Sequence, residues 1–328
     1  MDSVLNSHGS AFFLHSGGGC GKTYLAKLIA PGVRTTGRIV LCVASTGLAS
    51  LLLPGGRTAH SRFKIPIPCH EQSTCNIKKD DLNHQLLQQT SLIIWDEAGS
   101  QHHDVVESVD RTLHDLFNRN QPFGGVTILF GGDFRQILPV IQHGSREQIF
   151  PATLTHSNLW ENMSVHYLLQ NMSLGHDPES DHWAQQLFHI GVTDGDVIFP
   201  DHMHCGDDME SLIHAIYSQL FTRDQNEPHP DQYFLDCTIL APRNLQVHDI
   251  NSTIVNSIAP QEKITYLSAD SVTDREYDYI QPEVLHTFNP FGFPLHQLEL
   301  INGAPLMLLC NLDPIHGLYN EWHLLEAH

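Results

Sequence analysis

The sequence has no long apolar run and no leader-like start. Its longest apolar stretches, such as 48–53 and 306–309, fall far short of the roughly 20 residues that a membrane-spanning helix requires. The first six residues contain no basic segment followed by an apolar one, so no secretory leader is expected. Neither an association with the membrane nor secretion is therefore expected.

Paired cysteines are also lacking. The seven cysteines are an odd number without paired spacing, which favours free thiols in a reducing compartment over a disulfide framework. Two mixed groups, Cys69-His70 with Cys75 and His84, and His202 with His204 and Cys205, do not show the paired spacing of zinc ligands. Zinc is not expected at either group, and the 24 histidines have no assigned role.

Positive charge is scarce. The 17 Lys and Arg residues face 37 Asp and Glu residues, and the formal net charge is −20. This excludes a protein that grips nucleic acid over its whole surface, because phosphate contacts require cations. A single basic groove is compatible with this balance, and its candidate residues are Arg57, Arg62, Lys64, Lys78 and Lys79.

The order of apolar and amphipathic segments predicts an α/β protein. A chain of 328 residues with 41% hydrophobic content is expected to form one or two domains. Strand-like and helix-like segments alternate in the first half, which is typical of a parallel sheet covered on both faces. The expected strands are 11–15, 39–44, 91–95 and 126–130, and the expected helices are 22–30, 47–53 and 104–117.

The second half resumes after a polar connection between 171 and 204. There the pattern predicts a buried strand over 235–240, a helix over 244–258 and another strand over 305–310.

A glycine-rich loop follows the first expected strand and opens a helix, which is the context of a phosphate-binding loop. Glycines allow backbone N–H groups to turn toward phosphates, and the helix N-terminus adds positive potential. Lys22 is placed to reach the β and γ phosphates, and Thr23 to bind Mg²⁺. The loop residues are Gly17, Gly18, Gly19, Cys20 and Gly21, with Ser16 where such loops usually begin with glycine.

Two further strands end in polar residues. The strand at 92–95 is followed by Asp96 and Glu97, which are candidates for holding Mg²⁺ through water and for acting as the general base. The strand at 127–130 is followed by a polar segment containing Gln136, a candidate γ-phosphate sensor. Because ligands bind outside the carboxyl ends of parallel strands, these segments are expected to converge on the phosphates.

A segment with no phosphate chemistry lies between the first two of these motifs. Its hydroxyl groups, cations and rings suit a single strand of nucleic acid, whose backbone attracts cations and whose bases stack on rings. The residues concerned are Thr46, Thr58, His60 and Phe63. A solvated basic loop is the plainer interpretation of the same residues.

Together these motifs resemble the Pif-one-like helicases related to RecD, and in particular those carried by Helitron transposons. The resemblance is carried by Gly-Gly-Gly-Cys-Gly-Lys-Thr at 17–23, Gly-Gly-Arg-Thr-Ala-His-Ser-Arg-Phe-Lys-Ile-Pro at 55–66, Ile-Trp-Asp-Glu-Ala at 94–98, Gly-Gly-Asp-Phe-Arg-Gln-Ile-Leu-Pro-Val at 131–140, Tyr-Leu-Ser-Ala-Asp-Ser at 266–271, and Gly-Ala-Pro-Leu-Met-Leu-Leu-Cys-Asn-Leu-Asp-Pro at 303–314.

The resemblance implies two RecA-like domains, at 1–172 and 173–328, the second incomplete. It implies an ATPase site with ATP and Mg²⁺ formed by Lys22, Thr23, Asp96, Glu97 and Gln136. By the same resemblance Thr46, Thr58, His60 and Phe63 lie near DNA, and Arg243 belongs to a second-domain motif that holds the strand. The expected partner is single-stranded or forked DNA, with no obligate protein partner.

The implied function is 5′-to-3′ translocation coupled to ATP hydrolysis. Roles in DNA recombination, DNA repair and telomere maintenance are expected, in the nucleus or alternatively in mitochondria. Departures from the family pattern include Ser173 where relatives carry arginine, and Gly99-Ser100 where they carry Pro-Met. The sequence also starts after the usual adenine-reading glutamine and stops before the last motifs. A catalytically silent remnant that binds nucleotide or DNA is therefore the alternative, and a small-molecule kinase is a more remote one.

Overall fold

The computed structural model describes residues 2–6, 9–79, 81–141, 144–174, 178–192, 199–222, 231–241, 243–258, 263–271, 282–287, 295–301, 304–308 and 323–324. By its internal contacts the chain divides into two compact units, Met1–Asp196 and Val197–His328. In the described part of the chain, no helix combines the length and the apolar character needed to cross a bilayer.

The first unit is built on a six-stranded sheet in the order β3-β2-β4-β5-β1-β6. Every neighbouring pair in it runs parallel. The strands are β1 (Ala11–Ser16), β2 (Ile39–Ala44), β3 (Arg57–Thr58), β4 (Thr90–Asp96), β5 (Thr127–Gly132) and β6 (Met163–Leu168).

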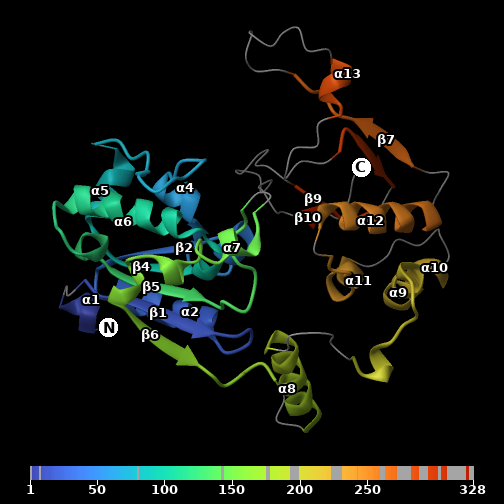
Figure 1. Cartoon of the computed structure of the whole chain (residues 1–328), viewed down its shortest axis with the longest axis horizontal. Helices are drawn as coiled ribbons and strands as arrows, with labels where there is room; N and C mark the ends of the chain where they lie inside the picture. The colour runs from blue at the N-terminus through green and yellow to red at the C-terminus, as the bar shows by residue number, and fades with distance from the viewer. Residues whose placement is uncertain are drawn as a thin grey trace. The chain divides into compact units, whose positions relative to one another are not determined.

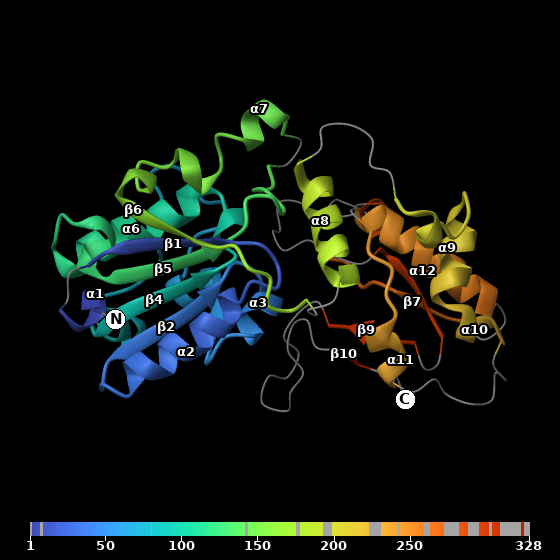
Figure 2. The ribbon, with the colours of Figure 1, turned by 90° about the horizontal axis from the view of Figure 1, so that it is seen from below.

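Both faces of this sheet are covered. Helices α2 and α6 lie on opposite sides of it (Figures 1 and 2), so the unit is a three-layer α/β/α arrangement. The helices of the unit are α1 (Asp2–Leu5), α2 (Lys22–Arg34), α3 (Gly47–Leu51), α4 (Ala59–Phe63), α5 (Leu82–Gln88), α6 (His103–Phe117), α7 (Arg146–Ile149) and α8 (Pro178–Val192), with short 3₁₀ turns at Ala98–Ser100, Pro122–Gly125, Leu154–His156 and Trp160–Asn162.

Alternate residues of the central strands enter two separate apolar clusters. In β4, Ile93 and Trp95 join the cluster beneath α6, whereas Leu92 and Ile94 join the cluster beneath α2. Since side chains of a strand alternate between the two faces of a sheet, a strand buried on both faces must be apolar almost throughout. The continuous apolar run at 92–95 is therefore explained by position in the sheet.

Aromatic rings form the centre of the cluster beneath α6. The Trp95 ring has no exposed surface, and its centroid lies 5.7 Å from that of Phe63 and 5.8 Å from that of Phe130. Phe63 comes from α4 and is 1% exposed. Phe63, together with the fully buried Ala59, therefore packs helix α4 against the sheet.

The second unit contains helices and two small antiparallel ladders among its described residues. Strand β7 pairs with β8, and β9 pairs with β10. The elements are a 3₁₀ turn at Asp201–Met203, α9 (Met209–Ile216), α10 (Ser218–Thr222), α11 (Asp231–Asp236), α12 (Asn244–Ile258), β7 (Ile264–Leu267), α13 (Pro282–Leu285), β8 (Gln297–Leu300), β9 (Leu306–Met307) and β10 (His323–Leu324).

The expected elements of the first unit are confirmed with ends shifted by up to a few residues, and the helix expected over 244–258 is confirmed with the same bounds. The strand expected over 235–240 is wrong: Leu235 and Asp236 end α11, residues 237–240 form no regular element, and Leu240 is 89% exposed. A short apolar run cannot by itself separate a strand from a helix end. The strand expected over 305–310 is found at Leu306–Met307, and residues 309 and 310 lie outside the described residues.

The division into units falls after Asp196, whereas the sequence places a boundary after Met172. Part of the polar stretch expected to be a connection forms α8, which the division groups with the first unit. The domain limits at 172 and 173 stay a prediction.

Replacing Phe63 with alanine is expected to lower the free energy of unfolding by about 3–5 kcal/mol, because it removes a buried ring and leaves a cavity against Trp95. Urea unfolding followed by Trp fluorescence measures this change. Ile67→Ala is the control: Ile67 is 84% exposed, and its replacement should change stability by less than about 0.5 kcal/mol. Equal stability of the Phe63→Ala variant and the parent would contradict the core role.

Candidate active site

The glycine-rich loop connects β1 to α2 at the carboxyl edge of the sheet. Gly19 and Gly21 have φ angles of 75° and 93°, which non-glycine residues adopt at a cost. A Cβ at Gly18 or Gly21 would meet no atom within 4 Å, so the space beside these backbone atoms is open. The loop can therefore present backbone N–H groups to a ligand at the start of a helix.

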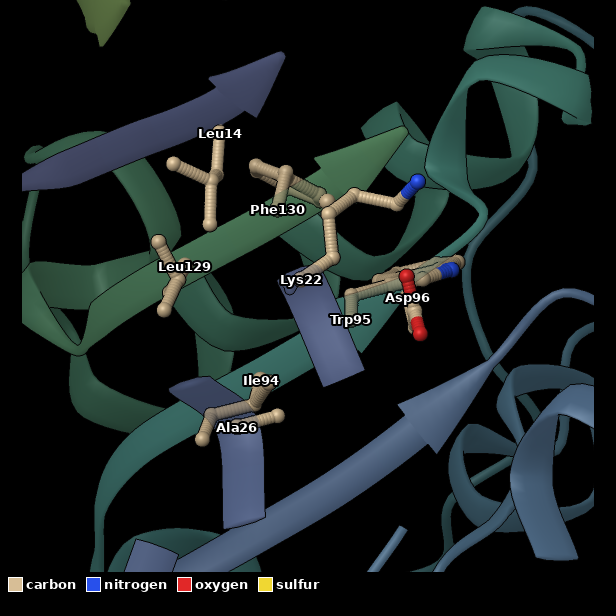
Figure 3. Close-up of a pocket in the computed structure, with 9 residues that line it drawn as sticks. Leu14, Lys22, Ala26, Ile94, Trp95, Asp96, Leu129 and Phe130 are labelled. Atoms are coloured by element: carbon tan, nitrogen blue, oxygen red, sulfur yellow. The ribbon is translucent and has the colours of Figure 1, made fainter. Parts of the chain in front are cut away.

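Lys22 is the first residue of α2 and points back to the strand ends. Its Nζ donates to the carbonyl oxygen of Ser16 at 3.1 Å and lies 3.9 Å from Oε1 of Glu97. Its side chain is only 10% exposed. Figure 3 shows Lys22 and Asp96 among the residues that line a small pocket between α2 and the sheet.

The two acids at the end of β4 take different positions. Asp96 is 6% exposed, and its Oδ1 accepts from the backbone N–H of Glu97 at 2.9 Å. A Cβ at Gly131 would lie 3.0 Å from Asp96 Oδ1 and 3.7 Å from Lys22 Cδ. Glycine on β5 therefore leaves room for both groups, and a larger residue there would displace one of them.

Glu97 has a left-handed backbone, with φ 54° and ψ 33°. This conformation is unfavourable for residues with a side chain, and it turns the carboxyl group away from the path of the strand. The carbonyl of Glu97 accepts from the hydroxyl groups of Ser45 at 2.7 Å and Ser100 at 2.9 Å. These bonds hold the turn that places the carboxylate near Lys22.

Burial raises the pKa of the Glu97 carboxyl above its ordinary value of 4.5, and the nearby charges of Asp96 and Asp133 act in the same direction. Lys22 opposes the shift. An acid with a raised pKa next to a lysine is suited to accept a proton near neutral pH.

Asp133 and Arg135 form a third group at this edge of the sheet. They lie in the motif at 131–140, but the sequence alone assigned neither of them a role. Arg135 makes a bidentate contact with Asp133, with Nε to Oδ1 at 2.9 Å and the other nitrogen to Oδ2 at 3.2 Å. Burial acts to raise the pKa of Asp133, but the hydrogen bonds from Arg135 outweigh it and the pKa is lowered. A Cβ at Gly17 would lie 3.1 Å from a terminal nitrogen of Arg135, so this guanidinium lies over the first glycine of the loop.

The segment after β6 also meets the loop. The backbone N–H of Met172 donates to the carbonyl of Gly19 at 2.9 Å, and a Cβ at Gly19 would lie 2.2 Å from Ser173 Oγ and 2.3 Å from Asn171 Oδ1. The sequence marked Ser173 only as a departure from a family pattern. Its contact with the loop depends on β6 pairing beside β1, a pairing that is not readable from local sequence.

The remaining predicted site residues are Thr23, Cys20 and Gln136. Thr23 is the second residue of α2, and Cys20 Sγ contacts the carbonyl of Gly18 at 3.8 Å. Gln136 is exposed, and its backbone N–H donates to the carbonyl of Asp133 at 3.1 Å. Their roles toward a nucleotide stay predictions.

Of the predicted DNA contacts, the two threonines have a visible structural use. Thr46 Oγ1 accepts from the N–H of Ala49 and caps α3, and Thr58 Oγ1 accepts from the N–H of Ser61 and caps α4. A capping hydroxyl still has its own proton to donate. His60 is half-buried, and burial lowers its pKa.

Phe63 does not fit the expected stacking on a base. Its ring is 1% exposed and stacks on Trp95, so no face of it is open to a ligand. The sequence showed an aromatic residue beside cations but not the direction of its side chain. Arg243 lies in the second unit, is exposed, and immediately precedes α12.

Two family models match the chain. Residues 1–195 match a model described as PIF1-like helicase, and residues 283–324 match one described as DNA helicase Pif1, 2B domain. The second segment lies within the range that the sequence assigned to one RecA-like domain. No pattern of residues in that segment predicted a separate module.

Curated relatives and solved structures agree with these matches. A Psychrobacter ATP-dependent DNA helicase Pif1 is 31% identical over 42% of this chain and 21% of the relative. An Emericella nidulans ATP-dependent DNA helicase PIF1 is 24% identical over 95% of this chain and 38% of the relative. The chain thus spans well under half the length of these relatives.

Among solved structures, a Bacteroides Pif1 helicase in complex with ADP-AlF3 and ssDNA has a TM-score of 0.62 and 21% identity. The match covers 98% of this chain and 66% of that one. At this identity the likeness shows the fold, and the α/β fold class expected from the sequence is confirmed.

The raised pKa of Glu97 predicts a pH-dependent effect of Glu97→Gln on stability. The folded state holds the Glu97 proton more tightly than the unfolded state, so stability is lost as the pH rises above 4.5, the ordinary value. Glutamine removes this loss, and the variant is expected to melt at a higher temperature than the parent at pH 8. The difference should shrink as the pH falls toward 4.5. A constant difference across this range in calorimetry would contradict the assignment.

Proposed function

Because the chain belongs to the PIF1-like helicase family, we propose that it binds ATP with Mg²⁺ and couples ATP hydrolysis to 5′-to-3′ movement along single-stranded DNA. One observation carries this proposal: the parallel strands bring Lys22 to 3.9 Å from Glu97, beside buried Asp96 and the glycine loop. A cation, two acids and open backbone N–H groups at one sheet edge are the parts that phosphoryl transfer to water requires.

The residues present fit a nucleoside triphosphate. The open backbone at Gly18 and Gly21 suits phosphate oxygens at a helix N-terminus, and Lys22 would contact the β and γ phosphates. The Thr23 hydroxyl and the Asp96 carboxylate are oxygen ligands of the kind that Mg²⁺ prefers. When bound, the metal neutralises charge that develops on the phosphate oxygens.

Glu97 would act on the attacking water. Its raised pKa, caused first by burial, lets the carboxylate take a proton near neutral pH. Gln136 would sense the γ phosphate, and Asp133 holds the Arg135 guanidinium over Gly17. The left-handed turn at Glu97 would keep the carboxylate directed to this position.

Two neighbouring arginines, Arg57 and Arg62, support single-stranded DNA as the partner. Burial and the neighbouring charge of Arg57 lower the pKa of Arg62, and Arg62 Nε is buried without a hydrogen-bond partner. In the part of the chain that the structure describes, neither arginine has a carboxylate within ion-pair distance. Two adjacent guanidinium groups without counter-charges suit a phosphate backbone, such as the ssDNA in the Bacteroides complex.

Membership of the PIF1-like helicase family is also the basis for proposing forked DNA as a substrate and roles in recombination, repair and telomere maintenance. We further propose a nuclear or mitochondrial location and no obligate protein partner. Thr46, Thr58, His60 and Arg243 are the proposed additional DNA contacts. A silent nucleotide-binding protein is the competing function, and it differs in having no turnover.

Lys22→Ala and Glu97→Gln are expected to reduce DNA-stimulated ATP hydrolysis by about 10²–10⁴-fold, since each removes one part of the transfer machinery. Glu97→Gln should retain ATP binding, because the loop and Lys22 stay in place. Phosphate release and binding of a fluorescent ATP analogue measure the two effects. Lys27→Ala, an exposed lysine of the same helix, should behave as the parent. If the parent hydrolyses ATP no faster than Lys22→Ala, the chain is a nucleotide-binding protein without ATPase activity.

Arg57→Gln combined with Arg62→Gln is expected to weaken binding of oligo-dT and to flatten its salt dependence. Each lost phosphate contact should reduce the slope of log K against log salt by about 0.7. Fluorescence anisotropy at several salt concentrations gives this slope. Arg119→Gln, two residues beyond the end of α6 at Phe117, is the matched control and should leave the slope unchanged. An unaltered slope in the double variant would remove these arginines from the DNA site.

A further inference from the structure

We propose that Asp270, His286 and His296 of the second unit form a binding site for a divalent transition-metal ion such as Zn²⁺. The ligand atoms of these three residues lie within 4.8 Å of one another. The proposal goes beyond the ATP and DNA function and does not depend on it.

The separations are close to those of a filled site. Asp270 Oδ2 lies 3.6 Å from His296 Nδ1 and 4.0 Å from His286 Nε2. Zinc binds nitrogen and carboxylate oxygen at about 2.0–2.2 Å, which places tetrahedral ligand atoms about 3.3 Å apart. The two carboxylate-to-imidazole distances exceed this spacing by about 0.3 and 0.7 Å, and water would be the fourth ligand.

The backbone already fixes two of the three ligands. Strands β7 and β8 pair up to Leu267 and Gln297, and the Ser268 N–H donates to the carbonyl of His296 at 2.8 Å. Asp270 and His296 therefore leave the same end of one ladder. His286 follows α13 directly, so a bound ion would connect the ladder to this helix and stabilise both.

Ser268 supplies the outer contact that metal ligands usually have. Its hydroxyl donates to Asp270 Oδ2 at 2.6 Å, and its oxygen lies 2.6 Å from His296 Nδ1. Because the one hydroxyl proton goes to Asp270, Ser268 Oγ accepts from His296 Nδ1 in this arrangement. The other neutral tautomer frees Nδ1 for a metal, while Ser268 still orients the carboxylate.

The two imidazole rings are stacked, with centroids 3.7 Å apart and planes inclined by 13°. In that arrangement the two nitrogen lone pairs lie in nearly parallel planes, so coordination of one ion requires one ring to turn. The side chains of His286 and His296 are 31% and 22% exposed, and the second torsion of histidine has a broad energy minimum. Stacking alone would not explain a carboxylate directed at both rings.

A second cluster of the same residue types, His102, His103 and Asp104, is a poorer site. His102 Nδ1 accepts from the backbone N–H of Asp104 at 3.1 Å and caps α6, so this nitrogen is already engaged. A cation at a helix N-terminus is also opposed by the helix dipole. This cluster therefore provides the matched control.

The test is Co²⁺ titration of the nucleotide-free full chain, followed by visible absorption, with Zn²⁺ as competitor. One equivalent of Co²⁺ is expected to give a ligand-field spectrum that Zn²⁺ abolishes, and Zn²⁺ is expected to raise the melting temperature. His286→Gln, His296→Gln and Asp270→Asn should each weaken binding at least about tenfold. His103→Gln should bind as the parent does.

Binding that ignores the three substitutions, or that is lost with His103→Gln, would overturn the proposal. Circular dichroism checks that each variant is folded. If a variant does not fold, the unaltered chain decides: Zn²⁺ should slow diethyl pyrocarbonate modification of His286 and His296 but not of His204, which is 64% exposed. Equal modification of all three histidines with and without Zn²⁺ would equally reject the site.

Discussion

The parallel alignment of β1, β4 and β5 is the constraint on which the candidate active site depends. In register, Trp95 lies beside Phe130, and His15 lies beside Gly132. All three strands therefore end at one edge, where the next residues in the chain are free to be polar. Without that register Lys22 and Glu97, which are far apart in sequence, would not lie 3.9 Å apart.

The same alignment places demands on packing. A strand covered on both faces cannot direct polar side chains away from the core, so the carboxylates appear only where β4 ends. Asp96 follows the buried Trp95 and is itself buried, with 6% exposure. Glu97 comes next, and its left-handed backbone conformation turns the chain out of the strand. Burial at this point raises the pKa of Glu97. The packing that stabilises the sheet therefore also sets the proton affinity of this carboxylate.

Charge is distributed in a way that the net value hides. A chain of formal charge −20 still places Arg135 over the glycine-rich loop and Arg57 next to Arg62. Arg135 is neutralised by Asp133 at hydrogen-bond distance, whereas the Arg57 and Arg62 pair has no such partner among the residues described. The contrast separates a cation fixed in position by a carboxylate from the two cations that we propose contact a phosphate backbone.

Local sequence determined the secondary structure of the first unit and most of the residues of the candidate active site. The glycine loop, Lys22, and the apolar strands ending in Asp96 and Glu97 could be predicted, because each depends on neighbouring residues and on the period of strand or helix. Family motifs indicated a helicase fold for the same reason. The apolar run at 235–240 was misjudged, since the period of so short a segment is ambiguous.

Only the tertiary structure decided what depends on contacts between distant segments. It buried Phe63 against Trp95, laid the segment of Met172 along Gly19, and brought Asp270, His286 and His296 together from three separate segments. Side-chain direction and strand order set such contacts, and neither is encoded in the spacing of residues along the chain.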